Sequence, residues 1–497
     1  MTPSLDIDES RRAPNPILGT LLVLTLALFI GAFSWLSSDQ ALPLLQLPLV
    51  LISFITVGVI GFLYFLNPAK SLTFILLGLL YFAFEFTARS SEADAGGGGT
   101  QTMVKGIVAM MFTIFAIFTS SRFMFKASLT GLFILYAAGA TATSFYSPAA
   151  IFGFVSGLSL LGLAMVAARL SHGEQADLLT MWRAIFFASC LTCLLSLALL
   201  AISPQQARDM SDMRYRLRGV TGAANALGPI MAIGFVVSLL MYRVAQRSAM
   251  RRFAQVMAVA FVAALLLTNS RSSILGLVAG MVGAALVAGA IGTFGLLVVL
   301  LVLAVGGATL LNPGINEAIL ELLASLFART GQVNELTTLT GRGVIWEACW
   351  KLIVERPWVG YGLGSVRVVL PLSYADEWGN TYGSAHNFLL ESLISVGWIG
   401  SLPLIAVLLM GLGFLISYFR KNRQDRKTLA KSAVPPERQV DVWLALCALR
   451  GLLTLLVQGM SEKSFAGQPG STTLALGAIL ATTVYVRRTQ VRKEHVF

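Results

Sequence analysis

His386 is the residue whose type and position best fit a role in proton transfer. The chain of 497 residues holds three histidines, and we expect His172 and His495, which lie in polar segments, to be solvated. His386 instead stands immediately before a long apolar run, in Ser384-Ala385-His386-Asn387-Phe388. An imidazole takes up and releases a proton near neutral pH, so it can act as a general base or acid. A lone histidine can equally be structural, and both interpretations remain open for His386.

Arg271 and Arg342 stand where a guanidinium could bind an anion. Arg271 lies at the junction of two apolar runs, where a charge must be solvated, paired or bound to a ligand. Arg342 precedes residues 343–355, whose helical periodicity predicts an amphipathic helix on the membrane surface. The N-terminus of such a helix attracts anions, and the planar guanidinium binds phosphate oxygens in pairs. These arginines predict an anionic ligand such as a lipid-linked pyrophosphate; for each one alone, a solvated arginine is the alternative.

Three more arginines are candidates. Arg216 and Arg218 lie in the polar stretch 203–223, and Arg450 stands inside the apolar run 445–457. A charge at membrane depth needs a partner or an aqueous cavity. Structural pairing of Arg450, with Glu85 for example, and a role in catalysis are both open.

The elements that must position these residues are membrane-spanning helices. The composition is 56% hydrophobic and only 12% charged, and the mean hydropathy is +0.77, whereas soluble domains carry about 25% charged residues. Apolar runs recur from residue 17 to residue 486 and predict about 12–14 spans. These numbers exclude a soluble enzyme, a disordered protein and a disulfide scaffold. They predict an all-α polytopic integral membrane protein.

The basic residues set the predicted orientation. With both termini in the cytoplasm, most of the 36 Lys and Arg residues fall on the cytoplasmic side, as the positive-inside rule requires. The largest outer loop then carries Arg342 and ends just before His386. The predicted organisation is a cytoplasmic N-tail over 1–16, transmembrane helices with short loops over 17–311, a large periplasmic loop with amphipathic helices over 312–385, C-terminal transmembrane helices over 386–486 and a cytoplasmic tail over 487–497.

Other site classes find no support in the sequence. No cluster of metal ligands and no phosphate-cradling P-loop is present in it, so we expect neither a metal nor coupling to ATP. We attribute the net charge of +12 to the orientation of the chain in the membrane. The sequence has no basic, aromatic-interleaved soluble domain that could bind a nucleic acid. Cofactors are therefore expected to be none, and membrane lipids are expected partners.

Several short motifs then resemble a known family. The pattern T-G-R-x-x-x-W occurs at Thr340–Trp346, P-x-x-G-x-G-x-G at Pro357–Gly364, and H-N-x-x-L with a later G-x-x-G at His386–Gly400. Ser270-Arg271 is similar to an S-R motif, and Arg218–Gly228 to an upstream R-G…N-x-x-G segment. Over residues 216–400, in this order, the chain resembles the O-antigen ligase and polysaccharide polymerase family.

This resemblance implies a function. Members transfer a glycan from undecaprenyl pyrophosphate to an acceptor hydroxyl on the periplasmic face of the bacterial inner membrane, and the implied fold is a GT-C-like, metal-independent glycosyltransferase. The resemblance assigns Arg271, Arg342 and Arg218 to the donor pyrophosphate and His386 to activation of the acceptor. Arg216, Arg450 and Asn387 are additional candidates. Ligation to lipid A–core is favoured; extension of a second lipid-linked glycan by a polymerase and transport of an anionic lipid-linked sugar are the alternatives.

Overall fold

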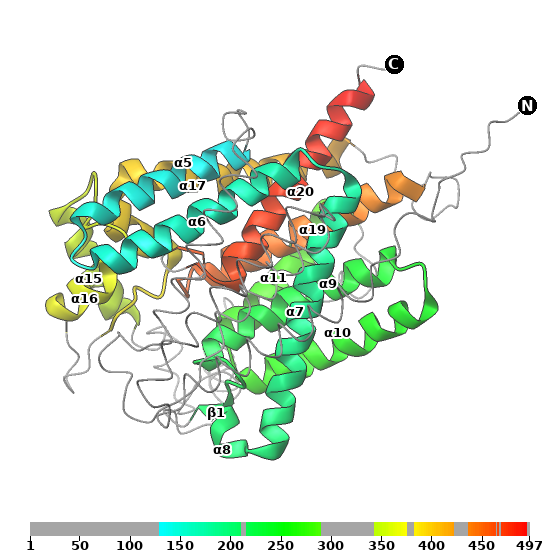
Figure 1. Ribbon diagram of the computed structural model, residues 1–497, viewed down its shortest axis with the longest axis horizontal. Coiled ribbons are helices and arrows are strands. Elements are labelled where there is room, and N and C mark those ends of the chain that lie inside the picture. The colour runs from blue at the N-terminus through cyan, green and yellow to red at the C-terminus, as the bar shows by residue number, and fades with distance from the viewer. Residues whose placement is uncertain are drawn as a thin grey trace, which may run out of the picture. The chain divides into compact units, whose positions relative to one another are not determined.

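Helices make up almost the whole part of the chain that the structure describes (Figure 1). The computed structural model describes residues 129–209, 215–289, 342–374, 382–421, 436–463, 465–466 and 469–494. All of them belong to one of the two compact units of the chain, Ala69–Thr87 with Ala109–Phe497. The expected N-tail, the spans before residue 129, the span at 293–311, residues 312–341 of the large loop and Glu85 lie outside the described residues.

Eight of the described helices are long and apolar enough to cross a membrane. This confirms the prediction of an all-α polytopic membrane protein. The elements from residue 129 to residue 288 are α5 (Leu129–Thr143), the short 3₁₀ helix η4 (Ser144–Tyr146), α6 (Ala150–Ser171), α7 (Gln175–Ile202), α8 (Pro204–Ala207), β1 (Arg208–Asp209), β2 (Arg216–Leu217), α9 (Ala224–Val244), α10 (Ser248–Thr268) and α11 (Arg271–Ala288). The later elements are α15 (Arg342–Glu355), α16 (Val366–Ser373), α17 (Phe388–Lys421), α19 (Pro436–Gly459) and α20 (Ser471–Glu494).

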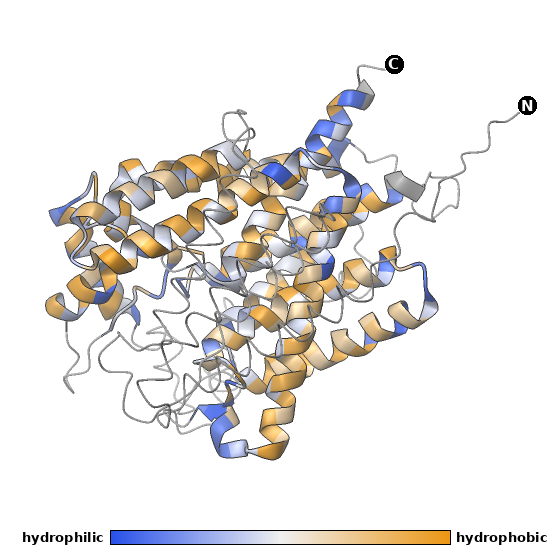
Figure 2. Ribbon diagram, viewed as in Figure 1, coloured by the Kyte–Doolittle hydropathy of each residue, from blue (hydrophilic) through white to orange (hydrophobic). Residues whose placement is uncertain are grey.

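The spans pack in neighbouring pairs. Helix α5 packs along α6 and α17, α20 lies against α6 and α19, and α9 lies against α10, α7 and α19. Figure 2 shows apolar residues over the bodies of these helices and hydrophilic residues towards several helix ends, such as the end of α20. Large side chains fill the core, among them Phe133, Trp182 and Phe261. The one polar atom of Trp182 is satisfied there, because its Nε1–H donates to Thr482 Oγ1 at 3.0 Å.

Small residues bring α11 and α19 into close contact. A Cβ atom at Gly276 would lie 2.7 Å from the carbonyl oxygen of Thr454, and one at Gly280 would lie 2.6 Å from that of Arg450. Small residues four apart allow such close approach of two membrane helices. Later residues of α11 meet earlier residues of α19, so the helices are antiparallel. Arg271, which begins α11, is therefore level with the end of α19.

Helix α17 is broken at Gly397, where φ is +67° and ψ is −173°. The break divides the long apolar run into a short first helix and a longer span. A non-glycine residue would be strained at this φ, and its Cβ would lie 2.3 Å from the backbone of Trp358. The break frees backbone groups that apolar surroundings could not satisfy.

The glycine loop Pro357–Gly364 satisfies those groups. Tyr361 N and Gly362 N donate to the carbonyl oxygens of Ile394 and Ser395, each at 2.8 Å. In return, Trp398 N donates to Pro357 O at 2.8 Å and Ile399 N to Trp358 O at 3.2 Å. Gly360 has φ +66°, and a Cβ there would lie 2.5 Å from Ile394 O. The glycine loop thus supplies hydrogen-bond partners for the backbone groups that the break in α17 leaves unpaired.

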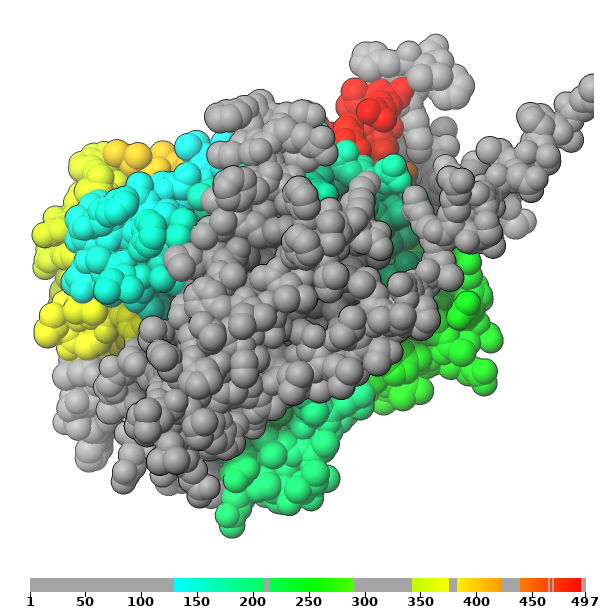
Figure 3. All heavy atoms as spheres, viewed as in Figure 1, coloured from blue at the N-terminus to red at the C-terminus, as the bar shows by residue number. Residues whose placement is uncertain are grey.

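Helices α15 and α16 form a second, smaller core with the start of α17. Helix α15 begins at Arg342 and covers the predicted helix over 343–355. Its buried residues, at the helical spacing of one face, pack with Val366, Leu370, Leu393 and Ile394; they are Ile345, Ala348, Cys349, Leu352 and Ile353. In Figure 3 this segment lies beside α5 and α6. Two of its large apolar side chains, Trp350 and Val354, remain exposed, which suits contact with lipid.

Candidate functional site

His386 lies in a tight loop that ends at the first turn of α17. Its φ is +48°, in the left-handed region, which is uncommon for a residue with a Cβ. Asn387 caps the helix, since its Oδ1 accepts from Leu389 N at 2.9 Å and Leu390 N at 3.2 Å. Buried Glu391 reaches back from the first turn and accepts from Ala385 N at 2.9 Å. These contacts fix the direction in which the imidazole leaves the loop.

The loop docks on the turn that follows α19. Asn387 Nδ2 donates to Met460 O at 3.0 Å, and Phe388 packs on Phe465 with ring centroids 4.9 Å apart. From the other side, Trp346 Nε1 of α15 donates to Ala385 O at 3.1 Å. Three segments far apart in sequence, α15, the His386 loop and the turn after α19, therefore meet at one place.

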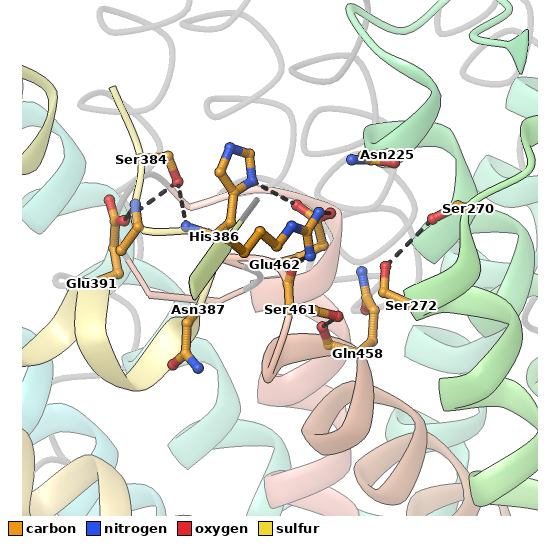
Figure 4. A network of polar contacts seen from close by, with 12 residues as sticks. Asn225, Ser270, Ser272, Ser384, His386, Asn387, Glu391, Gln458, Ser461 and Glu462 are labelled. Atoms are coloured by element: carbon orange, nitrogen blue, oxygen red, sulfur yellow. Dashed lines mark hydrogen bonds and ion pairs between the residues drawn. The ribbon is translucent and has the colours of Figure 1, made fainter. Parts of the chain in front are cut away.

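Glu462 joins two of the predicted site residues there (Figure 4). His386 Nδ1 lies 3.3 Å from Glu462 Oε2, and Arg342 Nη2 donates to Glu462 Oε1 at 2.9 Å. Arg342 Nη1 also donates to the carbonyl oxygen of Ser461. The Glu462 side chain is only 10% exposed, whereas that of His386 is 33% exposed. The imidazole is thus partly exposed, whereas the carboxylate is almost fully buried.

The electrostatics of Glu462 decide the tautomer of His386. Burial by itself would raise the pKa of Glu462, but the hydrogen bond with His386 and the positive charge of Arg342 outweigh it and hold this pKa below its usual value. The carboxylate is therefore ionised near neutral pH and can only accept hydrogen bonds. The Nδ1 atom of His386 must carry the proton that it shares with Glu462. In the neutral ring, Nε2 then keeps a free lone pair.

A second polar group lies at the start of α11. Asn269, at the end of α10, also has a positive φ, of +48°, and it turns the chain into Ser270 and Arg271. Ser270 Oγ lies 3.0 Å from Ser273 Oγ. Ser270 also packs on α9, because a Cβ at Gly228 would lie 2.7 Å from Ser270 Cβ. Since α11 and α19 are antiparallel, Arg271 begins its helix at the level of the Glu462 turn.

Arg216 is fixed beside this group. It is 6% exposed, its Nε donates to Thr268 O at 3.0 Å, and its Nη2 lies 2.5 Å from Asn225 Oδ1. Figure 4 shows Asn225 and Ser270 across the site from His386. Arg216 therefore holds the α9 and α10 sides of the site together.

The other predicted residues are placed as follows. Arg218 Nε donates to Gln206 O at 3.3 Å, in the loop that contains β1 and β2. Arg450 lies in the middle of the span Gln439–Gly459, about two turns of α19 before its end, and its buried Nε has no hydrogen-bond partner within the part of the chain described here. The structure thus joins Arg342, His386 and Asn387 by direct contacts with residues 460–462. The chemical roles of all seven candidates remain predictions.

Sequence reasoning missed two residues, Glu462 and Gln458. Both lie at the end of α19, and the only sequence signal was the polar triplet Ser461-Glu462-Lys463 that follows the apolar run 441–459. Glu462 meets His386 across 76 positions of sequence, a pairing that no local pattern announces. Within the described residues, no group of three or more His, Cys, Asp or Glu side chains could hold a metal ion.

Comparison with known proteins finds a family match over part of the chain, which includes some of the site residues. The family model described as O-antigen ligase matches residues 256–405, which include Arg271, Arg342, the glycine loop and His386. No curated protein matches the chain. O-antigen ligase domains belong to membrane glycan transferases of the ligase and polymerase type. Residues 256–405 thus match the O-antigen ligase family model, and they belong to a chain in which eight of the described helices are long and apolar enough to cross a membrane.

Proposed function

We propose that this protein transfers a glycan from undecaprenyl pyrophosphate to an acceptor hydroxyl, with ligation to lipid A–core as the favoured reaction. The matched domain supports the class of reaction. One observation carries the chemistry: a partly exposed imidazole is hydrogen-bonded through Nδ1 to a buried, ionised carboxylate, which a guanidinium holds from its other side.

His386 would act as the general base. Glu462 accepts the proton on Nδ1, orients the ring and stabilises the imidazolium that forms, a division of labour known from nucleophile–histidine–carboxylate sites. The free Nε2 takes the proton of the acceptor hydroxyl as its oxygen attacks the anomeric carbon. The bond from that carbon to the pyrophosphate breaks, and its electron pair moves to the pyrophosphate oxygen. General base catalysis of this kind contributes about 10²–10⁴ in rate.

The arginines would stabilise the leaving group. Negative charge grows on the oxygen that bridges the sugar and the pyrophosphate, and fixed guanidiniums in a dry site stabilise such charge strongly. Arg342 uses two of its five N–H groups on Glu462 and Ser461, and three remain for a ligand. Arg271 begins α11 at the same level, and Arg218 lies in the neighbouring loop. The pyrophosphate bond supplies the driving force, so ATP is not needed.

The distribution of charge supports a periplasmic site. Helix α17 runs from Phe388, next to the site, to Arg420 and Lys421 at its other end. The last turn of α9 carries Arg243, the link to α10 carries Arg247, and the start of α10 carries Arg251 and Arg252. Basic residues therefore gather at helix ends away from His386. Since Lys and Arg mark the cytoplasmic side, we propose that both termini are cytoplasmic and that His386 faces the periplasm of the inner membrane.

The test is transfer by the purified protein in detergent. Undecaprenyl-pyrophosphate-linked glycan is added with lipid A–core in one tube and without it in a second. Glycan on lipid A–core in the first tube means ligation; longer carrier-linked chains in the second mean polymerisation. The variant His386→Ala should lose product at least about 100-fold in either reaction, while the protein still accumulates and binds donor.

The matched control is His172→Ala. His172 lies at the end of α6, where its Nδ1 is 3.0 Å from Ala168 O, and its replacement should leave the rate unchanged. Full activity of His386→Ala would overturn the proposed base. Failure of the wild-type protein to make product in both tubes would overturn the proposed function.

A further inference from the structure

The side chain of Gln458 carries two buried polar atoms without a partner. The residue is 1% exposed, and neither Nε2 nor Oε1 makes a hydrogen bond within the part of the chain that the structure describes. No other described residue leaves two buried side-chain atoms unsatisfied in this way. A buried amide without partners destabilises the protein, and an apolar side chain of the same shape would avoid this. Its presence calls for a ligand.

Gln458 lies within the proposed site. A Cβ at Gly276 of α11 would lie 3.1 Å from Gln458 Cβ, so the glutamine is held in the close contact between α11 and α19. Its carbonyl oxygen accepts from Ser461 N at 3.1 Å, in the turn that carries Glu462. Figure 4 shows its amide rising beside Ser272, between Glu462 and Asn225. One helical turn, about 5 Å, separates it from Glu462.

The chemistry of an amide selects the ligand. Nε2 donates and Oε1 accepts, so a ligand that satisfies both must accept and donate. Pyrophosphate oxygens only accept, and their negative charge would face Oε1. A sugar hydroxyl or an acetamido group offers both functions. The amide therefore fits the sugar and not the pyrophosphate.

We propose that Gln458 is a sugar-recognition residue. It binds a hydroxyl or acetamido group on the sugar whose anomeric carbon reacts, about one helical turn from Glu462, which contacts both His386 and Arg342. A glutamine has three rotatable bonds, so its amide reaches the sugar without movement of α19. This inference rests on the proposed function. It names the chemical group of the donor that the enzyme recognises.

The experiment compares donors that differ in one group. Two carrier-linked glycans are prepared, one with a hydroxyl or acetamido group next to the anomeric carbon and one with hydrogen there. The wild-type protein should favour the first by about 10-fold or more in kcat/KM, because the second leaves the buried amide unpaired. In Gln458→Met, which has nearly the same shape, the preference should fall to about 1.

Stability gives an independent readout. Removing an unsatisfied amide should raise the Tm of the ligand-free protein by about 2 °C or more in Gln458→Met, whereas most core substitutions lower Tm. The control is Gln255→Met at an exposed position of α10, which should leave both Tm and donor preference unchanged. If Gln458→Met accumulates poorly, Gln458→Glu keeps the shape, loses the donor and should also lose the preference.

The two proposals fail in different ways. If the wild-type protein transfers both donors but Gln458→Met or Gln458→Glu keeps the wild-type preference, the sugar-recognition role is wrong. A wild-type protein that transfers both donors equally well also overturns it. If the wild-type protein transfers neither donor to any acceptor, the proposed function itself fails.

Discussion

Two stretches pack against the start of α17, and they meet it in different ways. The glycine loop Pro357–Gly364 forms its hydrogen bonds with α17 through backbone groups, and four of them satisfy the break at Gly397. The turn Met460–Lys463 joins it largely through side chains, among them Asn387, His386 and Glu462. The first stretch resolves its polar groups internally. The second brings charged groups together beside the partly exposed His386, and an unpaired amide lies one helical turn away.

The difference separates scaffold from chemistry. Both stretches carry polar groups at the ends of membrane-spanning helices, and both have recognisable sequence patterns. A polar group whose every partner is in the protein holds the fold, whereas an unpaired or partly exposed one is available to a ligand. By this criterion the glycine motif is structural, and the residues 458–462 with His386 are the site. Substitutions in the two stretches test this division.

Replacing Gly397 should damage the fold most. In Gly397→Ala the new Cβ would lie 2.3 Å from Trp358 backbone atoms, at a φ of +67°. We expect the free energy of unfolding to fall by about 3 kcal/mol or more. The midpoint of thermal unfolding in detergent measures it. The control is Gly413→Ala in the same helix, where a Cβ meets nothing within 4 Å. Equal thermal midpoints for the two variants would show that the break at Gly397 does not require glycine.

Replacing Glu462 should damage chemistry more than fold. Glu462→Gln keeps the shape but removes the charge that fixes the proton on His386 Nδ1, so we expect kcat to fall about 100-fold. Transfer assays and size-exclusion profiles measure rate and folding. Glu347→Gln is the control, because Glu347 is 68% exposed on α15 and pairs with Lys351. Wild-type rates in Glu462→Gln would show that the carboxylate has no part in the reaction.

Asn387 has both a structural role and a contact with the site, because it caps α17 and also binds the turn after α19. Asn387→Ala loses both roles, and we expect a loss of about 1 kcal/mol in stability with a lower rate. Asn387→Asp keeps the cap but loses the Nδ2 donor to Met460 O. Because an Asp oxygen would face Met460 O, Asn387→Asp should also lose some stability. It should lose rate if the docking of the loop matters for catalysis. A wild-type rate in Asn387→Asp would show that only the cap counts.

The pH dependence of stability should show a smaller effect. The pKa of Glu462 is lower in the folded protein than in the unfolded chain. Its contribution is therefore fully present above the unfolded pKa of about 4.3 and is lost as pH falls through the lower folded value. Thermal midpoints between pH 6 and pH 3.5 should fall more steeply for the wild type than for Glu462→Gln. Parallel curves would contradict the pKa shift.

The sequence anticipated features that local patterns encode. The amphipathic helix expected over 343–355 is present as α15, Arg342–Glu355. His386 and Arg342 were chosen as candidates from their residue type and their position beside apolar runs. Glu462 was missed because its charge stands in an ordinary polar turn. Gln458 was missed because an uncharged residue inside an apolar run gives no signal.

The sequence is enough to predict a bundle of membrane-spanning helices. Hydropathy and charge are properties of each segment and do not depend on which other segments pack against it. The sequence also determined which residue types could bind an anion or move a proton. Two features appear only in the tertiary structure. His386 has a carboxylate partner 76 positions away, and the glycine loop hydrogen-bonds the backbone of α17 at its break. Those pairings depend on how α11, α17 and α19 pack, and packing joins side chains whose distance along the chain carries no information about their distance in space.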